Sequence, residues 1–266
     1  AGYRHGEPGD DGGQEEEVIE RWGRSPLALA GLLVLSGAIG AGIVLGVQAL
    51  TGGAGAADDR RIGAVVREYV LDHPEILPEA MKRLQARETG KAVAAAGDAI
   101  FTPYAGAWEG NPDGDVTVSV WMDYACGYCR ASLPEIARLV ASDPKVRIVY
   151  RELPVLSEIS RVAARWGLAA AEQGRFKAFH TALYGGGQLS EATIAAAAAS
   201  AGLDRAKAQA AVAAPRMDAE IDRNLKIAGE LGVTGTPSWV VGDQVVSGMV
   251  PYAVLKQAVA AARAKK

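Results

Sequence analysis

Apolar and polar residues divide the N-terminal part of the chain into segments of different character. Residues 1–26 are polar and rich in acidic side chains, which predicts a solvated tail with a short helix over residues 15–22. Residues 27–50 carry no charged side chain, and a helix of that length spans a bilayer with some tilt. We therefore expect a single transmembrane anchor over residues 27–50, followed by a Gly/Ala-rich linker over residues 51–60.

Two other interpretations of the apolar run stay open, a buried core helix and a cleaved signal peptide. Ala54-Gly55-Ala56 has the form of a signal cleavage site, but the run is longer than a usual signal core and follows a polar tail. Arginines flank the run on both sides, so the positive-inside rule does not orient it. We favour an uncleaved anchor over both alternatives.

The next segment, residues 61–97, has the apolar spacing of amphipathic helices. One stripe contains Ile62, Val66 and Tyr69, and a second begins after Pro74, which suits the first turn of a new helix. Two such short helices must bury their apolar stripes against the rest of the chain or against copies of the same segment. We expect this helical segment to form a homo-oligomer.

Beyond residue 98 the pattern alternates between strands and helices. Buried strands are predicted over residues 116–122 and 146–150 with a helix over 130–142 between them, then helices throughout 157–230, strands over 233–241 and 244–247, and a closing helix over 252–264. This order predicts an α/β protein with a thioredoxin-like fold over residues 98–266 and a helical domain inserted at about 157–230.

Composition narrows the functional classes. Apolar residues make up 49% of the chain and charged residues 22%, as in ordinary globular proteins. A net charge of −3 without a basic cluster gives no reason to expect a nucleic-acid partner. The three histidines lie far apart, and we interpret His180 as a packed helical residue; with two cysteines in all, we predict neither a metal site nor a cofactor.

Both cysteines lie in one C-x-x-C, formed by Cys126 and Cys129, between a predicted buried strand and a predicted helix. Unpaired N–H groups at the start of that helix stabilise a thiolate at Cys126, which is the form that attacks disulfides. Cys129, about one turn further on, then closes the pair or resolves a mixed disulfide. The competing hypotheses are an inert internal disulfide and a Cu(I) site made of two soft thiolates.

Other residues contribute to the predicted site with less specificity. Thr236-Pro237 precedes a predicted strand, and a cis proline beside a redox pair presents the preceding backbone to a substrate chain; the alternative is an ordinary loop proline. Glu152 and Asp123 are candidate proton relays, with a solvated loop charge as the alternative. Tyr128, between the cysteines, is a candidate substrate contact.

Several motifs resemble the DsbA-like branch of the thioredoxin superfamily over roughly residues 98–266. They are Asp123-Tyr124-Ala125-Cys126-Gly127-Tyr128-Cys129-Arg130, Arg151-Glu152-Leu153-Pro154, Phe176-Lys177-Ala178-Phe179-His180 and Gly235-Thr236-Pro237-Ser238. Upstream, Val66-Arg67-Glu68-Tyr69-Val70 and His73-Pro74-Glu75-Ile76-Leu77 resemble the N-terminal segment of ScsC-type proteins (suppressor of copper sensitivity), which assembles those chains into oligomers. The resemblance implies a bacterial periplasmic disulfide shuttle with Thr236-Pro237 as its cis-proline site.

Gly127-Tyr128 departs from the Pro-His dipeptide of strong oxidases and looks more like the dipeptide of disulfide isomerases. Without a histidine there, one source of thiolate stabilisation is missing, so we expect a milder oxidoreductase that forms, reduces or isomerises disulfides. This chemistry needs an oxidising compartment, which places the C-terminal part in the periplasm, anchored to the inner membrane by a single pass. The expected partners are exported cysteine-containing proteins and a membrane redox partner. A Cu(I)-binding, copper-tolerance role for the same thiolates is the alternative.

Overall fold

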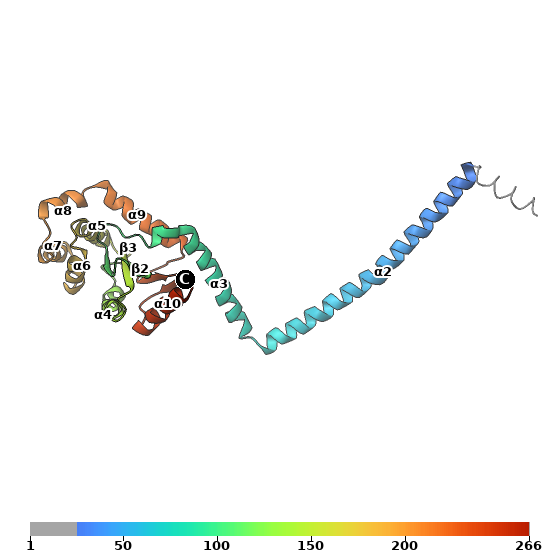
Figure 1. Cartoon of the computed structure of the whole chain (residues 1–266), viewed down its shortest axis with the longest axis horizontal. Helices are drawn as coiled ribbons and strands as arrows, with labels where there is room; N and C mark the ends of the chain where they lie inside the picture. The colour runs from blue at the N-terminus through green and yellow to red at the C-terminus, as the bar shows by residue number, and fades with distance from the viewer. Residues whose placement is uncertain (1–25, 266) are drawn as a thin grey trace, which may run out of the picture. The chain divides into compact units, whose positions relative to one another are not determined.

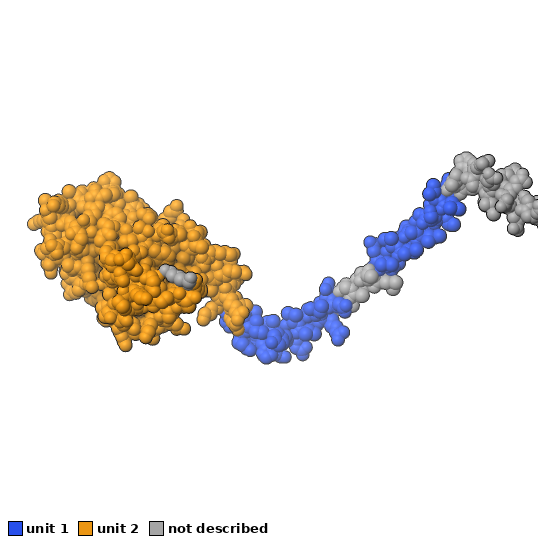
Figure 2. Space-filling model, viewed as in Figure 1, with its two compact units in different colours: residues 1–78 blue, residues 79–266 orange. Residues whose placement is uncertain are grey.

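The computed structural model describes residues 26–265, without the side chains of residues 26, 28, 29 and 50–57, and divides at residue 78 into two compact units (Figures 1 and 2). The predicted tail and its short helix over residues 15–22 lie outside the described residues. Helix α2 (Pro26–Asp72) contains the stretch Ala30–Ala49, which is long and apolar enough to cross a membrane. Length and composition are equally those of a signal sequence.

The segment over residues 51–60, predicted as a Gly/Ala-rich linker, is helical, because α2 continues through it. Alanine has the highest helix propensity, each glycine costs only about 1 kcal/mol, and the segment has no proline to remove a backbone donor. The first short helix expected in residues 61–97 is therefore the C-terminal part of α2. The break before the second helix is confirmed, since α2 ends at Asp72 and α3 (Ile76–Ala96) begins after Pro74.

A five-stranded sheet forms the centre of the second unit, in the order β1-β3-β2-β4-β5. Strands β2 and β3 are parallel, and the other neighbours are antiparallel. The parallel pair needs a crossover, which α4 (Gly127–Ser142) provides. The strands are β1 (Trp108–Gly110), β2 (Val116–Met122), β3 (Val146–Glu152), β4 (Ser238–Val241) and β5 (Gln244–Ser247).

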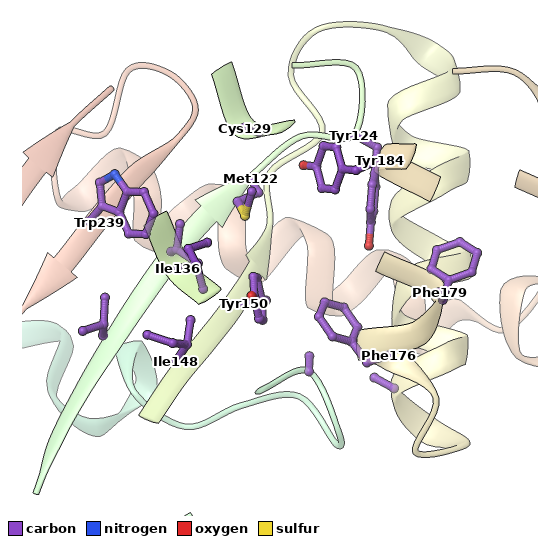
Figure 3. Close-up of a cluster of buried hydrophobic side chains, with 14 of the residues drawn as sticks. Met122, Tyr124, Cys129, Ile136, Ile148, Tyr150, Phe176, Phe179, Tyr184 and Trp239 are labelled. Atoms are coloured by element: carbon purple, nitrogen blue, oxygen red, sulfur yellow. The ribbon is translucent and has the colours of Figure 1, made fainter. Parts of the chain in front are cut away.

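Alternating side chains of β2 supply two cores, one on each face of the sheet. Val118, Val120 and Met122 belong to the larger core, which α4 and α10 (Tyr252–Ala264) cover (Figure 3). Trp121, which points to the opposite face, packs with residues of α3, of the short helix η1 (Gly97–Ile100) and of α9 (Pro215–Glu230). Strand β2 is therefore buried on both faces, as its nearly continuous apolar sequence predicts.

Five helices form the insert between β3 and β4, which confirms the helical stretch predicted over residues 157–230. Pro215 occupies the first turn of the last helix, where its missing N–H costs nothing. Small side chains such as Ala164, Ala208 and Ala211 let three of the helices pack closely in a separate apolar cluster. The insert consists of α5 (Glu158–Glu172), α6 (Phe176–Gly185), α7 (Glu191–Ser200), α8 (Arg205–Val212) and α9.

The predicted strands and closing helix are confirmed with a few differences. Strands β2 and β5 and helix α10 have the predicted bounds, whereas β4 begins at Ser238 instead of residue 233, because the segment before it forms the loop around Pro237. Strand β1 and η1 were not predicted. The observed order of elements is an α/β thioredoxin-like arrangement with a helical insertion.

Candidate active site

Cys126 lies at the junction of β2 and α4, where it is the N-cap residue of α4. Its Sγ accepts a hydrogen bond from the Cys129 backbone N–H at 3.4 Å, and its own N–H donates to the Asp123 carbonyl oxygen at 3.0 Å. The cap position sets the sulfur against the end of the helix that carries free N–H groups and partial positive charge. The predicted strand-to-helix setting of the pair is therefore confirmed.

The two cysteines, which are both free thiols, differ in burial. Cys126 is 7% exposed, whereas Cys129 is completely buried. Burial raises the pKa of the Cys129 thiol strongly, so Cys129 stays protonated at neutral pH. Cys126 is therefore the more accessible of the two thiols.

The loop before β4 brings Thr236 and Pro237 against the pair. Their peptide bond is cis, and the Cys126 Sγ donates to the Thr236 carbonyl oxygen at 3.3 Å. The Pro237 carbonyl accepts from the Gly248 N–H at 2.7 Å, which ties the end of β5 to the same loop. The structure thus places the predicted Thr236-Pro237 dipeptide in contact with Cys126.

Asp123, the residue after β2, is buried and holds two loops together. Its Oδ1 accepts from the Ala125 N–H at 2.8 Å, and its Oδ2 accepts from the N–H groups of Val155 and Leu156 at 2.9 and 3.0 Å. Three backbone donors satisfy the carboxylate and fix the loop after β3 beside the loop that leads to Cys126. These bonds favour a positioning role for Asp123.

Glu152, Tyr124 and His180 form a buried polar cluster beside this loop. Glu152 ends β3 inside the protein, so its interpretation as a solvated loop charge is wrong. Burial raises the pKa of Glu152 well above its ordinary value, and the hydrogen bond with Tyr124 opposes that effect. The Tyr124 hydroxyl oxygen lies 3.1 Å from His180 Nδ1, and burial lowers the pKa of His180 to about 3, which leaves the imidazole neutral at pH 7.

Tyr128, the remaining predicted site residue, lies in the first turn of α4 with its side chain 69% exposed. Three other large apolar side chains near the site, those of Val155, Leu156 and Met249, are also exposed. The backbone N–H groups of Val155 and Leu156 donate to Asp123, and Met249 follows Gly248, whose N–H donates to Pro237. The mouth of the site is therefore rimmed by apolar groups that are open to solvent.

Sequence reasoning missed the roles of Tyr124, Tyr184 and Gly167. The Tyr184 hydroxyl donates to the Asp123 carbonyl oxygen at 2.9 Å, and a side chain at Gly167 would collide with Glu152 and Tyr124. His180 and Tyr184 lie four residues apart and so share one face of α6. Two polar aromatic residues at that spacing in an otherwise apolar helix were the sequence signal that could have revealed these roles.

The comparisons with known proteins agree with this geometry. Residues 117–260 match the model of the DSBA-like thioredoxin domain, and residues 58–89 match that of the copper resistance protein ScsC N-terminal domain. The chain is 30% identical over 138 residues to the Na⁺/H⁺ antiporter NhaA 3 of Salinispora tropica, which covers 51% of this chain and 21% of that protein. The chain thus spans only about a fifth of the length of the curated relatives that it matches.

Solved structures match over nearly their whole length. A thioredoxin-like oxidoreductase from Silicibacter pomeroyi is 45% identical, with a TM-score of 0.61, and the match covers 63% of this chain and 98% of that one. A variant of Proteus mirabilis ScsC is 27% identical, with a TM-score of 0.64, over 79% and 97% of the two chains. A periplasmic thioredoxin-like protein from Salmonella enterica is 28% identical, with a TM-score of 0.55, over 63% and 95%. The chain therefore belongs to the DSBA-like thioredoxin domain family, a family of thiol–disulfide oxidoreductases.

Proposed function

We propose that this oxidoreductase acts on exported proteins in the periplasm, with Cys126 as the attacking thiol and Cys129 as the resolving thiol. The observation that carries the proposal is the asymmetry of the pair: Cys126 caps α4 and reaches solvent, and Cys129 is buried and protonated. A single-turn spacing lets the buried thiol close on the outer one. An inert internal disulfide has no need for this arrangement.

In the oxidising direction, a substrate thiolate attacks Cys126 of the disulfide form. The Cys126–Cys129 bond breaks, and Cys129 leaves and takes up a proton, which its raised pKa favours. A second substrate thiolate then attacks the substrate sulfur of the mixed disulfide, and Cys126 leaves as a thiolate. The substrate loses two electrons and the pair gains them, so a membrane redox partner has to reoxidise the pair.

In the isomerising direction, the Cys126 thiolate of the reduced pair attacks a substrate disulfide and releases one substrate thiolate. A different substrate thiolate then displaces Cys126, which rearranges the disulfide without net electron transfer. Gly127-Tyr128 supports this milder chemistry, because no histidine between the cysteines adds to the stability of the thiolate.

Substrate chains bind, in this proposal, as an extended segment beside Thr236 and Pro237. The Thr236 carbonyl oxygen accepts from the Cys126 sulfur, and it becomes available to a backbone donor once a substrate replaces this thiol contact. The exposed ring of Tyr128 supplies an apolar surface beside the first cysteine. Glu152 is the proposed proton relay, and we assign to Asp123 the positioning of the two loops.

The N-terminal apolar helix and the periplasmic relative indicate export. We propose further that residues 27–50 stay as a single-pass anchor in the inner membrane and that residues 61–97 assemble copies of the chain. Leu77, Met81 and Leu84 support the assembly, because these large apolar side chains are exposed at helical spacing along α3. A second copy of the same stripe is the partner that would cover them.

The test is a refolding assay with the purified chain and two substrates, one reduced and one oxidised with scrambled disulfides. Activity on the scrambled substrate identifies an isomerase, and activity on the reduced substrate alone identifies an oxidase. Cys126→Ala is expected to abolish both, whereas Cys129→Ser is expected to trap mixed disulfides at Cys126. Lack of thiol activity together with tight uptake of Cu(I) would contradict the proposal and favour the copper-binding alternative.

A further inference from the structure

Helix α6 of the insert reaches the loop before Cys126 with two polar side chains. Tyr184, which is buried, donates its hydroxyl hydrogen to the Asp123 carbonyl oxygen at 2.9 Å. The same carbonyl oxygen accepts the Cys126 N–H at 3.0 Å. The Asp123 carbonyl oxygen therefore links the insert to the backbone of Cys126. The Tyr184 ring also packs beside the Tyr124 ring (Figure 3).

His180 makes the second contact, one helical turn earlier. Its Nδ1 lies 3.1 Å from the Tyr124 hydroxyl oxygen. Its ring stacks on Phe176 at a centroid distance of 5.1 Å and packs against Tyr150 at 4.5 Å, so the surrounding rings fix its orientation. The Tyr124 contact is thus held from a rigid helix.

His180 Nε2 has no hydrogen-bond partner among the described residues, although the side chain is buried. Burying a polar nitrogen without a partner is costly, and an apolar side chain of similar shape would fill this aromatic pocket without that cost. Core stability alone therefore gives no reason for a histidine here. The contact to Tyr124 gives one, because Tyr124 belongs to the loop that leads to Cys126.

Tyr124 is confined from a third side by α5. A Cβ atom at Gly167 would lie 2.8 Å from the Tyr124 hydroxyl oxygen and 2.8 Å from Glu152 Oε1. The absence of a side chain at Gly167 is thus what admits Tyr124 and Glu152 to this space. Two helices of the insert, α5 and α6, therefore define where Tyr124 lies.

We infer that His180 and Tyr184 are positioning residues through which the helical insert sets the reactivity of Cys126. They hold Asp123 and Tyr124, and these hold Cys126 at the N-cap, where its sulfur accepts the Cys129 N–H. Loosening the loop moves the sulfur away from these donors and disfavours the thiolate. The reduced pair then becomes less stable relative to the disulfide. The inference rests on the proposed function, because it concerns the same pair of thiols.

The test compares variants of the full chain in two measurements: the equilibrium with oxidised and reduced glutathione, and the rate of alkylation of Cys126 against pH. Tyr184→Phe and His180→Leu are expected to shift the glutathione equilibrium toward the disulfide by about five-fold and to slow alkylation at pH 6 by about three-fold. His180→Asn keeps a hydrogen-bonding group near the position of Nδ1 and should restore most of the wild-type behaviour. Tyr150→Phe is the matched control, since it keeps the ring that packs against His180 and removes a buried hydroxyl that bonds at 2.5 Å to Glu109 and not to the loop before Cys126.

Folded Tyr184→Phe and His180→Leu proteins with wild-type equilibria and alkylation profiles would overturn the inference. So would a Tyr150→Phe variant that changes both readouts as much, because the effect would then be a general loss of packing. Thermal melting of every variant identifies those that fold. Failure of the proposed function is distinguishable, because the wild-type chain would then be inactive in refolding while its glutathione equilibrium could still be compared with those of the variants.

Discussion

Replacing Gly167 by alanine probes the contact between the helical insert and the residues that precede Cys126. Gly167 is buried in the middle of α5. The added methyl carbon would lie 2.8 Å from the Tyr124 hydroxyl oxygen, 2.8 Å from Glu152 Oε1 and 3.4 Å from Tyr124 Cε2. Non-bonded carbon atoms pack at about 3.5–4.0 Å, so both Tyr124 and Glu152 have to move.

Two effects of opposite sign determine the result. Alanine is favoured over glycine in a helix interior by about 1 kcal/mol. Overpacking a buried site costs about 1–3 kcal/mol, and displacing Tyr124 weakens its hydrogen bond to His180, which contributes about 1 kcal/mol. We therefore expect Gly167→Ala to lower the free energy of unfolding by about 2 kcal/mol.

Gly229→Ala is the matched control, because Gly229 also lies in a helix, α9, and a Cβ there would meet nothing within 4 Å. This variant should keep the wild-type stability or gain up to about 1 kcal/mol. Urea unfolding followed by tryptophan fluorescence measures both variants, and alkylation of Cys126 reports whether the site has shifted. A Gly167→Ala protein as stable and as reactive as the wild type would refute the reasoning, because Tyr124 and Glu152 would then not be confined by α5.

Three further predictions follow from burial and charge. Burial lowers the pKa of His180 from 6.5 to about 3, so the folded state favours the neutral ring. This contribution to stability is complete above pH 6.5 and is lost as the pH falls toward 3, up to about 5 kcal/mol. His180→Asn should therefore flatten the stability profile over that range in urea titrations, and an equally steep profile would contradict the assignment. Arg151→Met removes the buried partner of Glu220 and should lower the free energy of unfolding by about 3–5 kcal/mol. Arg223→Met removes the half-exposed partner of Glu220 and should lower it by less than about 1 kcal/mol; equal losses would be evidence against a buried pair. Met81→Lys should reduce the molar mass in sedimentation, and a wild-type chain that is already monomeric would exclude the proposed assembly.

Local patterns in the sequence were enough for the elements that carry the cysteines. The apolar run of β2 and the helical periodicity after Cys126 predict a strand-to-helix junction, because each pattern records which faces of one element are buried. The N-cap position of Cys126 follows from that junction. The linker predicted over residues 51–60 has a conformation that the glycines did not indicate, because the high helix propensity of alanine lets α2 continue through it.

The sequence by itself determined the β-α-β unit and the helical insert, through their apolar periodicity, and the C-x-x-C, through its spacing. Each of these features depends on residues close together in the chain. The tertiary structure alone decided what surrounds the pair. Thr236 contacts Cys126 from 110 residues away, and His180 reaches Tyr124 from 56 residues away. Glu152 became a buried acid because β3 extends through it and α5 covers it, with Gly167 admitting its carboxyl. A pattern within one element shows that a face is buried, but the element that covers it, and the hydrogen bonds that result, depend on how distant segments pack.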